Sequence, residues 1–494
     1  MTVPVRSQQP QPMLQSALAW LTMRPPDDPL HDLGPLKQHL KEVAEASIQP
    51  LQRLKVLELF QSRVDSTSKT LKPRLVGASL PLPHRLRSIA EGLTDIHGLL
   101  ASATLRSMHE LRPEDLARPV QDMPAYCTRI LGNLAEQQQI ALFVSTTAPN
   151  GVWVQAQEAF RLLRTIEGAD TVAAERLLKG MLALVAVQPE SFTAREILFL
   201  AEYLHRFATA VDIRHQPLPP LENWHWLEES RDLPPVAIVR RPPPSHGTVL
   251  YFSCATLARI AAQHVMQLAN GESLATLRLP PGNDVNHREL LARAQACWLT
   301  PPRRHAHRRP SHYRVEICSQ FQTLWTLMGD SAPKVSGDGT PITDWMVLNE
   351  SPSGMALMHV SGPVAELVPG DTLGLRTAPG QPWNIGLIRW ARSDNPEHFE
   401  LGLEMISPSA VPVQIVQGST TSAKVSPALL FPASSSLEHN ETLMTARGQA
   451  DIGPFTLIGG TDGKVQLTRC QMRRLALQTA KVEIFEFTRD SAPQ

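Results

Sequence analysis

The residues best suited to binding chemistry form an arginine- and histidine-rich segment at positions 303–314, called the arm below. The arm holds five Arg and three His in twelve residues and no acid. A guanidinium group can bind phosphate through two parallel hydrogen bonds, pair with the O6 and N7 edge of guanine, and stack on a base. The arm therefore predicts an anion or nucleotide site, although such a charge run is also typical of a solvated linker.

The three histidines of the arm could also be considered as metal ligands. They are His305, His307 and His312, and no Cys, Asp or Glu within the arm completes a ligand set. Zinc sites use defined tetrahedral sets of ligands. We therefore predict no metal site, and we interpret the histidines as polar or partly charged companions of the arginines.

A second segment, Asn349-Glu350-Ser351-Pro352-Ser353-Gly354, joins two predicted strands and is called the Asn-Ser-Gly turn below. Asn and Ser carry short side chains that bond the backbone or a ligand, and Gly lets the chain turn without a Cβ clash. Many β-turns share this composition. The segment becomes informative because the arm precedes it and a short apolar run, from Gly354 to Leu357, follows it.

The secondary structure that positions these segments changes along the chain, and the N-terminal half is predicted to be helical. From Met13 to Asp212 apolar residues recur every three or four positions, as in Val56, Phe60 and Val64, which is the helical period. We predict an all-helical N-terminal half over 1–220, joined at Pro-rich breaks. The expected helices lie near 13–23, 35–47, 50–66, 85–111, 124–145, 152–167, 171–187 and 192–212.

A small mixed α/β module is predicted over 235–300. It has strands at Val236–Val239 and Val249–Phe252 and helices at about Ala255–Leu268 and Asn286–Leu299. From Arg314 onward, short strands separated by Gly and Pro turns predict a small antiparallel barrel over 301–415, followed by a β-rich extension over 416–494. The expected barrel strands are Arg314–Ile317, Asp344–Asn349, Gly354–Val360, Asp371–Arg376, Trp383–Trp390 and Phe399–Met405. The fold class is thus multidomain α+β.

Charge and composition exclude several classes of protein. Among 494 residues, Lys+Arg and Asp+Glu each total 47, so the chain as a whole does not attract nucleic acid or anionic membrane, and any anion site must be local. The longest apolar run, Met181 to Val187, is too short for a membrane helix, and no secretory signal is evident. The five cysteines match neither a disulfide framework nor a CxxC zinc site. We therefore expect a cytoplasmic protein.

Catalytic motifs are missing from the sequence. We find no G-x-S-x-G, no phosphate loop with G-x-x-x-x-G-K-[ST] spacing, and no His-Glu metal motif. We therefore predict that the protein is not an enzyme and has no catalytic residues.

The arm, the Asn-Ser-Gly turn and the strand Leu401-Gly402-Leu403-Glu404-Met405 together resemble the PilZ domain family. The resemblance covers about 301–415 and implies a six-stranded antiparallel barrel. It also implies one ligand, the bacterial second messenger cyclic diguanylate (cyclic di-GMP), and no other cofactor. The stretch from Cys297 to Pro302 and the long helical half resemble a multidomain bacterial subgroup of such proteins.

The resemblance implies roles for residues in both segments. Asn349, Ser351 and Gly354 match the family's turn, which holds guanine and phosphate. The family's arm carries Arg-x-x-x-Arg, whereas Arg309 and Arg314 have four residues between them. Because Arg314 lies next to the predicted strand, as the last arginine of the family does, the predicted ligand arginines are Arg308, Arg309 and Arg314, with Arg303 and Arg304 as additional arm cations.

Three functions compete at this point. The first is a cyclic di-GMP receptor that relays ligand binding to an unidentified protein partner, with the helical half as the contact. The second is a degenerate PilZ barrel that acts as a nucleotide-independent protein-interaction scaffold. The third is RNA or DNA binding by the arm, which we disfavour because the chain is neutral and few aromatic residues lie near the arm.

Overall fold

The computed structural model describes most of the chain in two compact units. The first unit is Met1–Ala78, Leu82–Pro189 and Ala194–Arg303, and the second is Ser79–Pro81, Glu190–Thr193 and Arg304–Gln494. The described residues are 12–78, 80–111, 119–165, 168, 170–282, 285–301, 303, 306–329, 342–361, 366–395, 398–418, 423–433, 441–460, 465–479 and 481–490.

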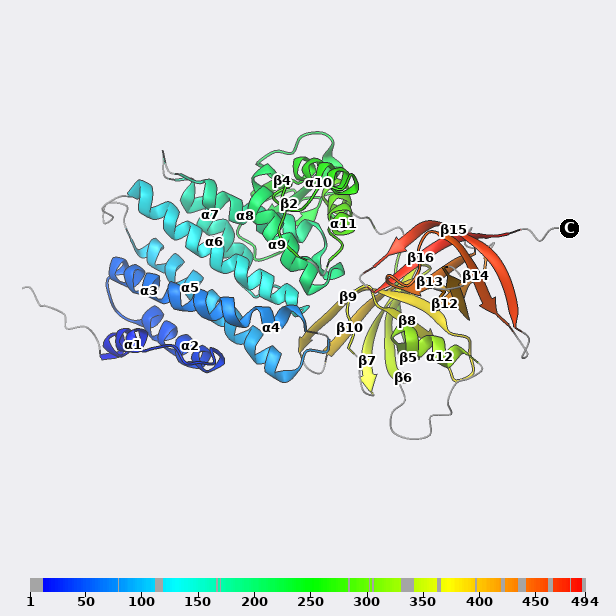
Figure 1. Cartoon of the computed structure of the whole chain (residues 1–494). Helices are drawn as coiled ribbons and strands as arrows, with labels where there is room; N and C mark the ends of the chain where they lie inside the picture. The colour runs from blue at the N-terminus through cyan, green and yellow to red at the C-terminus, as the bar shows by residue number, and fades with distance from the viewer. Residues whose placement is uncertain are drawn as a thin grey trace, which may run out of the picture. The chain divides into compact units, whose positions relative to one another are not determined.

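The first unit begins with helices that pack side by side (Figure 1). Each of the eight predicted helical ranges overlaps an observed helix, so the all-helical half is confirmed. The helices are α1 Pro12–Thr22, α2 Leu30–Glu45, α3 Pro50–Leu71, α4 Pro73–Val76, α5 His84–Glu110, α6 Pro119–Phe143, α7 Val152–Leu163, α8 Val172–Ala186 and α9 Ala194–Phe207, with short 3-10 turns at Pro189–Ser191, Ala208–Ala210 and Leu221–Asn223.

Helices α2 and α6 begin earlier than predicted, because each of them continues through a proline at which it was expected to begin. Pro35 lies inside α2 and Pro124 lies inside α6, so both helices begin at least one turn earlier than predicted. Each proline removes one backbone N–H from the helical ladder. Burial of the rest of each helix outweighs that local loss, as for Leu36 and Leu40 of α2, which are 0% and 1% exposed.

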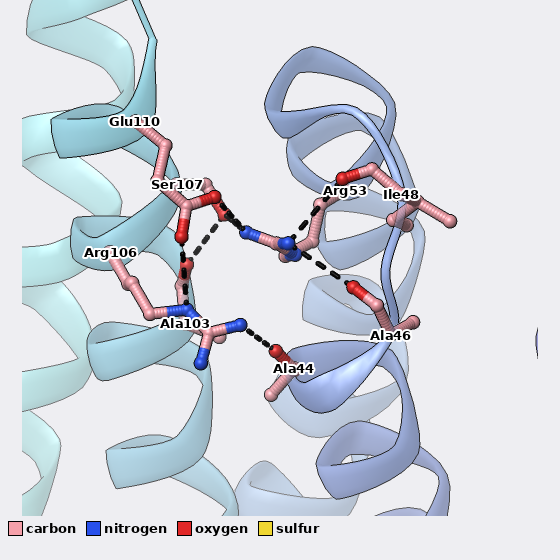
Figure 2. Close-up of polar contacts among 8 residues, drawn as sticks. All are labelled: Ala44, Ala46, Ile48, Arg53, Ala103, Arg106, Ser107 and Glu110. Carbon is pink, nitrogen blue, oxygen red and sulfur yellow. Dashed lines mark hydrogen bonds and ion pairs between the residues drawn. The ribbon is translucent and has the colours of Figure 1, made fainter.

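A buried arginine fixes the connection between α2 and α3 (Figure 2). Arg53 of α3 is 4% exposed, and its Nη1 donates to Glu110 Oε2 at 2.7 Å and to Ser107 Oγ at 3.3 Å. Its Nη2 donates to the carbonyl oxygens of Ala46 at 3.2 Å and Ile48 at 3.4 Å. Arg53 therefore links the residues that follow the end of α2 to Ser107 and Glu110, and it holds α3 against α5.

The predicted α/β module is present, and its sheet is larger than predicted. The antiparallel sheet has the order β1-β4-β2-β3, and helices α10 and α11 follow it. Trp298 of α11 is fully buried and donates its Nε1 hydrogen bond to the Ala183 carbonyl of α8 at 2.9 Å, which fastens the module to the helical half. The elements are β1 Asp212–Arg214, β2 Trp224–Glu228, β3 Val236–Ala237, β4 Val249–Ser253, α10 Ala255–Ala269 and α11 His287–Leu299. Strands β1 and β2 were not predicted.

The second unit contains two closed six-stranded antiparallel barrels (Figure 1). The first barrel comprises β5 Arg309–Ser319, β6 Ile342–Ser351, β7 Gly354–Ser361, β8 Thr372–Arg376, β9 Asn384–Asn395 and β10 His398–Ser407, with α12 Phe321–Met328 after β5. The second barrel comprises β11 Val411–Gln417, β12 Lys424–Phe431, β13 Thr442–Ala446, β14 Gly453–Gly459, β15 Gln466–Gln478 and β16 Val482–Arg489. The six-stranded barrel of the predicted fold class is confirmed, and the β-rich segment after it closes into a barrel of its own.

Both barrels have the same strand order. If the strands of each barrel are numbered one to six along the chain, the closed order is 1-2-3-6-5-4 in both cases. They also share a hydrophobic core, in which Leu324 of α12 and Leu387 of β9 pack with Leu429 of β12. Trp325 of α12 donates its Nε1 hydrogen bond to the Val413 carbonyl of β11 at 2.8 Å. The second barrel is therefore packed against the first through α12.

No helix among the described residues is long and apolar enough to cross a membrane.

Candidate functional site

The Asn-Ser-Gly turn closes the hairpin between β6 and β7. Ser351 pairs with Gly354, and Ser351 Oγ donates to the Gly354 carbonyl at 3.1 Å. A Cβ atom at Gly354 would collide with the backbone carbonyl of Leu403 on β10. Met405 N donates to the Ser353 carbonyl at 3.0 Å, so the turn is held on β10 as well as on its own strands. Only glycine fits at position 354, because the backbones approach so closely there.

One arginine of the arm reaches this turn. Arg308 lies directly before β5 and is half-buried, and its Nη1 donates to Asn349 Oδ1 at 2.8 Å. Asn349 is the third-last residue of β6. The structure thus joins the two segments that the sequence analysis singled out, and it places a positive charge beside the turn.

The other arm residues lie on or before β5. Arg309 is the first residue of β5 and pairs in register with Glu350, whereas Arg314 pairs with Met346, further along the barrel wall. Both side chains are exposed. Arg303 is exposed before the strand, and Arg304 lies outside the described residues. The structure therefore brings Arg308 together with Asn349 and places Arg314 three β6 residues away from that contact.

The first barrel strand starts earlier than predicted, so part of the arm is strand. β5 begins at Arg309 and not at Arg314, and its register shifts between Pro310 and Tyr313. Such a bulge tolerates proline, which has no N–H to donate to the ladder. The sequence did not predict this part of the strand, because its charged and polar residues do not alternate with apolar residues as in a typical strand.

Glu350 of the turn accepts hydrogen bonds from two residues of the arm. Ser311 Oγ donates to Glu350 Oε1 at 2.9 Å, and Tyr313 Oη donates to Glu350 Oε2 at 2.8 Å. Burial, with added contributions from the hydrogen bond and the charge of Glu350, raises the pKa of Tyr313 to about 12. The hydroxyl therefore stays protonated and keeps donating to the carboxylate, which fixes β5 against β6 at the mouth of the barrel.

A row of side chains on the outer barrel wall extends the site across four strands. Asn349 pairs with Ala356, Ala356 with Gly402, and Gly402 with Trp390. Residues paired directly across antiparallel strands point to the same face of the sheet. A Cβ atom at Gly402 would overlap the indole of Trp390, so the ring lies flat on that glycine. The row thus has an amide at one end, an aromatic ring at the other and two small residues between them.

Trp390 is the site residue that the sequence analysis missed. Its strand and the strand of Gly402 are both predicted from the sequence, but the pairing of Gly402 with Trp390 depends on strand register. A usable signal was present, because Trp390 is a large aromatic residue in a strand between Arg389 and Arg392. A half-buried aromatic ring on a barrel wall is a typical stacking surface for a base.

The site can bind a flat, anionic, hydrogen-bonding molecule. Arg308 supplies a cation, and the Asn349 amide and Ser351 hydroxyl supply hydrogen-bonding groups. Trp390, which packs over Gly402, offers an aromatic face. Among the described residues, no group of three or more His, Cys, Asp or Glu side chains could hold a metal ion, and His305 lies outside them.

Comparison with protein families identifies the first barrel. Residues 327–412 match the family model described as "Cyclic-di-GMP receptor FimW, middle PilZ domain". The first barrel is a PilZ domain. The matched range of the PilZ domain includes the Asn-Ser-Gly turn, Trp390 and Gly402, and it begins after the arm. Residues 15–218 match a second model, described as "Cyclic-di-GMP receptor FimW, N-terminal domain".

A curated relative of the chain agrees with these matches. The cyclic-di-GMP receptor FimW of Pseudomonas aeruginosa is 34% identical over 103 residues, which is 20% of this chain. The aligned part covers 17% of the length of that relative. The PilZ assignment made from the arm, the turn and the closing strand is confirmed.

Proposed function

We propose that the PilZ domain binds cyclic di-GMP on the outer wall of the barrel and that the chain relays this binding to a protein partner. The contact between Arg308 and Asn349 carries the proposal, because it unites the arm with the turn in a single site. The family models and the relative that match this chain are described as cyclic-di-GMP receptors, which supports the choice of ligand.

The chemistry of the ligand fits the groups present. Cyclic di-GMP carries two phosphates and two guanines, so its site needs cations, hydrogen-bonding groups and a stacking surface. Arg308 and Arg309 stand beside the turn for the phosphates and guanine edges, and Trp390 offers a face for a base. Micromolar binding requires about 8 kcal/mol, which a few charge-assisted hydrogen bonds and one stacking contact can supply. Arg314 is expected to contribute less, because it pairs with Met346 and so lies further along β6 from the turn.

The arm also spans one of the points at which the chain passes from one unit to the other. Arg303 is the last residue of the first unit and Arg304 belongs to the second. A ligand that captures the arm would restrict the chain at this crossing, and fixing the backbone of one residue costs about 1–2 kcal/mol. We infer that this coupling carries the signal and that the helical unit contacts the partner.

Calorimetric titration of the full chain with cyclic di-GMP tests the receptor function. Asn349→Ala and Arg308→Ala should each weaken binding about tenfold or more, because each removes a charge-assisted or ligand-facing hydrogen bond. Arg473→Ala is a matched control, since Arg473 is exposed on the second barrel. A folded wild-type chain that gives no heat of binding would exclude the receptor. A pull-down with unchanged partners in the presence and absence of nucleotide would then support the scaffold.

We further propose that the protein acts in the cytoplasm as a receptor and not as an enzyme. The cysteines are free thiols, as is typical of a reducing compartment, and the matching family models describe receptors.

A further inference from the structure

The second barrel carries apolar side chains on one part of its outer wall. Val425 of β12 is 58% exposed and Leu467 of β15 is 66% exposed. Val416 of β11 and Ile458 of β14 are half-buried. Val416 pairs with Val425, Ile458 pairs with Leu467, and β11 pairs with β14 between them. These four residues form a contiguous surface, called the free wall below.

The free wall faces away from the interior of the second barrel. Ile415, Leu457 and Cys470 belong to the interior hydrophobic cluster of this barrel. Side chains alternate between the two faces of a strand, so the residues of the free wall point outward. Soluble proteins rarely expose a contiguous apolar surface unless it binds something. The free wall is therefore a candidate docking surface.

The free wall continues an interface that the chain already uses. Leu429 follows Val425 on β12 and faces the same way. It is fully buried and packs with Leu324 of α12 and Leu387 of β9. The outer surface of β12 is thus covered by the PilZ domain at one end and uncovered at the other.

The corresponding wall of the PilZ domain shows what covers such a surface. Because both barrels have the same strand order, β11, β14 and β15 correspond to β5, β8 and β9. Cys318 of β5 pairs with Gly374 of β8, which pairs with Ile385 of β9. Leu324 of α12 lies directly on Gly374, where a Cβ atom would collide with it, and packs with Cys318 and Ile385. A helix therefore covers this wall in the first barrel.

The second barrel has no room for an equivalent helix in its own chain. Helix α12 lies in the connection between β5 and β6, which spans 320–341, whereas the connection between β11 and β12 spans only 418–423. That connection is shorter than the 8 residues of α12. Four strands span about 14 Å, and a helix as long as α12 spans about 12 Å, so such a helix matches the width of the free wall.

We propose that the free wall docks an amphipathic helix of a partner polypeptide, in the position that α12 occupies on the PilZ domain. The docked helix presents large apolar residues at positions i, i+3, i+4 and i+7, as α12 does with Phe321, Leu324, Trp325 and Met328. This surface belongs to the second barrel, so it is additional to the partner contact assigned to the helical unit and requires no bound nucleotide.

The test uses the full-length chain and a fluorescein-labelled peptide with the sequence Phe321–Met328, held helical by a hydrocarbon staple that replaces Gln322 and Thr326. Fluorescence anisotropy should rise and saturate with a dissociation constant on the order of 0.1 mM. A stapled peptide of the same composition with its apolar residues spread around the helix should bind about tenfold more weakly. Absence of saturable binding up to about 1 mM would overturn the proposal.

Three variants assign the binding to the free wall. Leu467→Asp and Val425→Asp should each weaken binding about tenfold or more, because docking would bury an unpaired charge. Leu59→Asp is the matched control and should bind as the wild type does, because Leu59 is 58% exposed, as Val425 is, and lies in the other unit. Melting temperatures verify that each variant is folded. Unchanged affinity in both folded wall variants would overturn the proposed location.

Two measurements test other occupants of the free wall. Sedimentation that shows a dimer of the wild type and a monomer of Leu467→Asp would overturn the helix and assign the wall to a second copy of the chain. Binding to vesicles of phosphatidylcholine and phosphatidylglycerol that Leu467→Asp abolishes would overturn it in favour of a lipid surface. A monomer that ignores vesicles and binds the peptide through Leu467 would support the proposal.

Discussion

At the scale of single residues, the proposed ligand face depends on two glycines. Gly354 permits the backbone of the turn to approach Leu403, and Gly402 leaves space for the indole of Trp390. The two positions serve different purposes. Gly354 allows the Asn-Ser-Gly turn to form, whereas Gly402 sets the orientation of an aromatic ring at the opposite end of the row.

Gly402→Ala should displace the Trp390 ring. The new methyl group would overlap the indole, and overpacking of this kind costs about 1–3 kcal/mol. We expect a lower melting temperature and weaker binding of cyclic di-GMP. Gly34→Ala in α2 is the matched control, because a Cβ there meets nothing within 4 Å, and alanine in a helix is favoured by about 0.5–1 kcal/mol. Equal behaviour of the two variants would contradict the assigned role of Gly402.

Asp371 provides a residue-scale prediction about pH. It lies between β7 and β8, and burial raises its pKa to about 6, although the Val368 N–H and Lys481 act in the opposite direction. The folded state therefore holds the proton more tightly than the unfolded state does. This contribution to stability is fully present below the unfolded pKa of 3.8 and is lost as the pH rises through 6.

Asp371→Asn should remove this pH dependence. Asn cannot ionise, and its amide oxygen can still accept the hydrogen bond from Val368 N, which is 2.9 Å from Asp371 Oδ2. We expect the variant to be more stable than the wild type by roughly 1–3 kcal/mol at pH 7.5 and to differ little near pH 4. Thermal unfolding across this range measures the difference. Parallel pH profiles for the two proteins would show that Asp371 does not titrate in this way.

At the scale of elements, helix α7 depends on a cap that comes from far along the chain. The carboxylate of Asp232 accepts hydrogen bonds from the backbone N–H groups of Gly151, Trp153 at 3.0 Å and Val154 at 3.3 Å. Backbone N–H groups at the start of a helix have no carbonyl partner within the helix, and Asp232 supplies that partner here. The negative charge also faces the positive end of the helix dipole. The element thus starts at Val152 because of a residue about 80 positions away.

Asp232→Ala should loosen the start of α7. Loss of such a cap costs about 0.5–2 kcal/mol, and Asp232→Asn should cost less, because it keeps an acceptor and loses only the charge. Hydrogen exchange of the amides at positions 153 and 154 should accelerate in the alanine variant, with exchange in the second unit unchanged. Equal protection of these amides in all three proteins would exclude the capping role.

At the scale of the whole molecule, the two barrels of the second unit share one hydrophobic core. Leu429 of β12 is fully buried in a cluster that includes Ile385 and Leu387 of the PilZ domain. The two barrels have the same strand order, but the residues between β12 and β13 contain no Asn-x-Ser-x-x-Gly sequence. The second barrel therefore contributes packing to the PilZ domain, and its β12–β13 connection lacks the ligand turn.

Leu429→Ala should destabilise both barrels together. Truncation of a buried leucine costs about 2–5 kcal/mol, and here the resulting cavity opens onto side chains of both barrels. We expect loss of cyclic di-GMP binding at a lower temperature than in the wild type. Val425→Ala on the same strand is exposed and should have little effect. Separate unfolding of the second barrel, with the PilZ domain unaffected, would contradict a shared core.

The sequence by itself determined which segments of the first unit are helical, and it predicted which segments carry the proposed binding chemistry. Apolar spacing located the helices of the first unit, because burial of one helix face imposes a local period on the sequence. The residue types of the arm and the turn predicted the ligand chemistry, because guanidinium, amide and glycine have intrinsic properties. Asn349, Ser351 and Gly354 are recognisable as one motif without tertiary information, but the structure places them in the strands that flank the turn.

Tertiary structure alone decided which of these residues meet and what surrounds them. Arg308, and not Arg314, contacts Asn349, because β5 starts at Arg309 and carries a bulge that no local pattern specifies. The row from Asn349 to Trp390 exists only through strand register, since its members are distant in sequence. The second barrel and its free wall likewise arise from long-range packing, which depends on shape complementarity between segments and not on the period of any one of them.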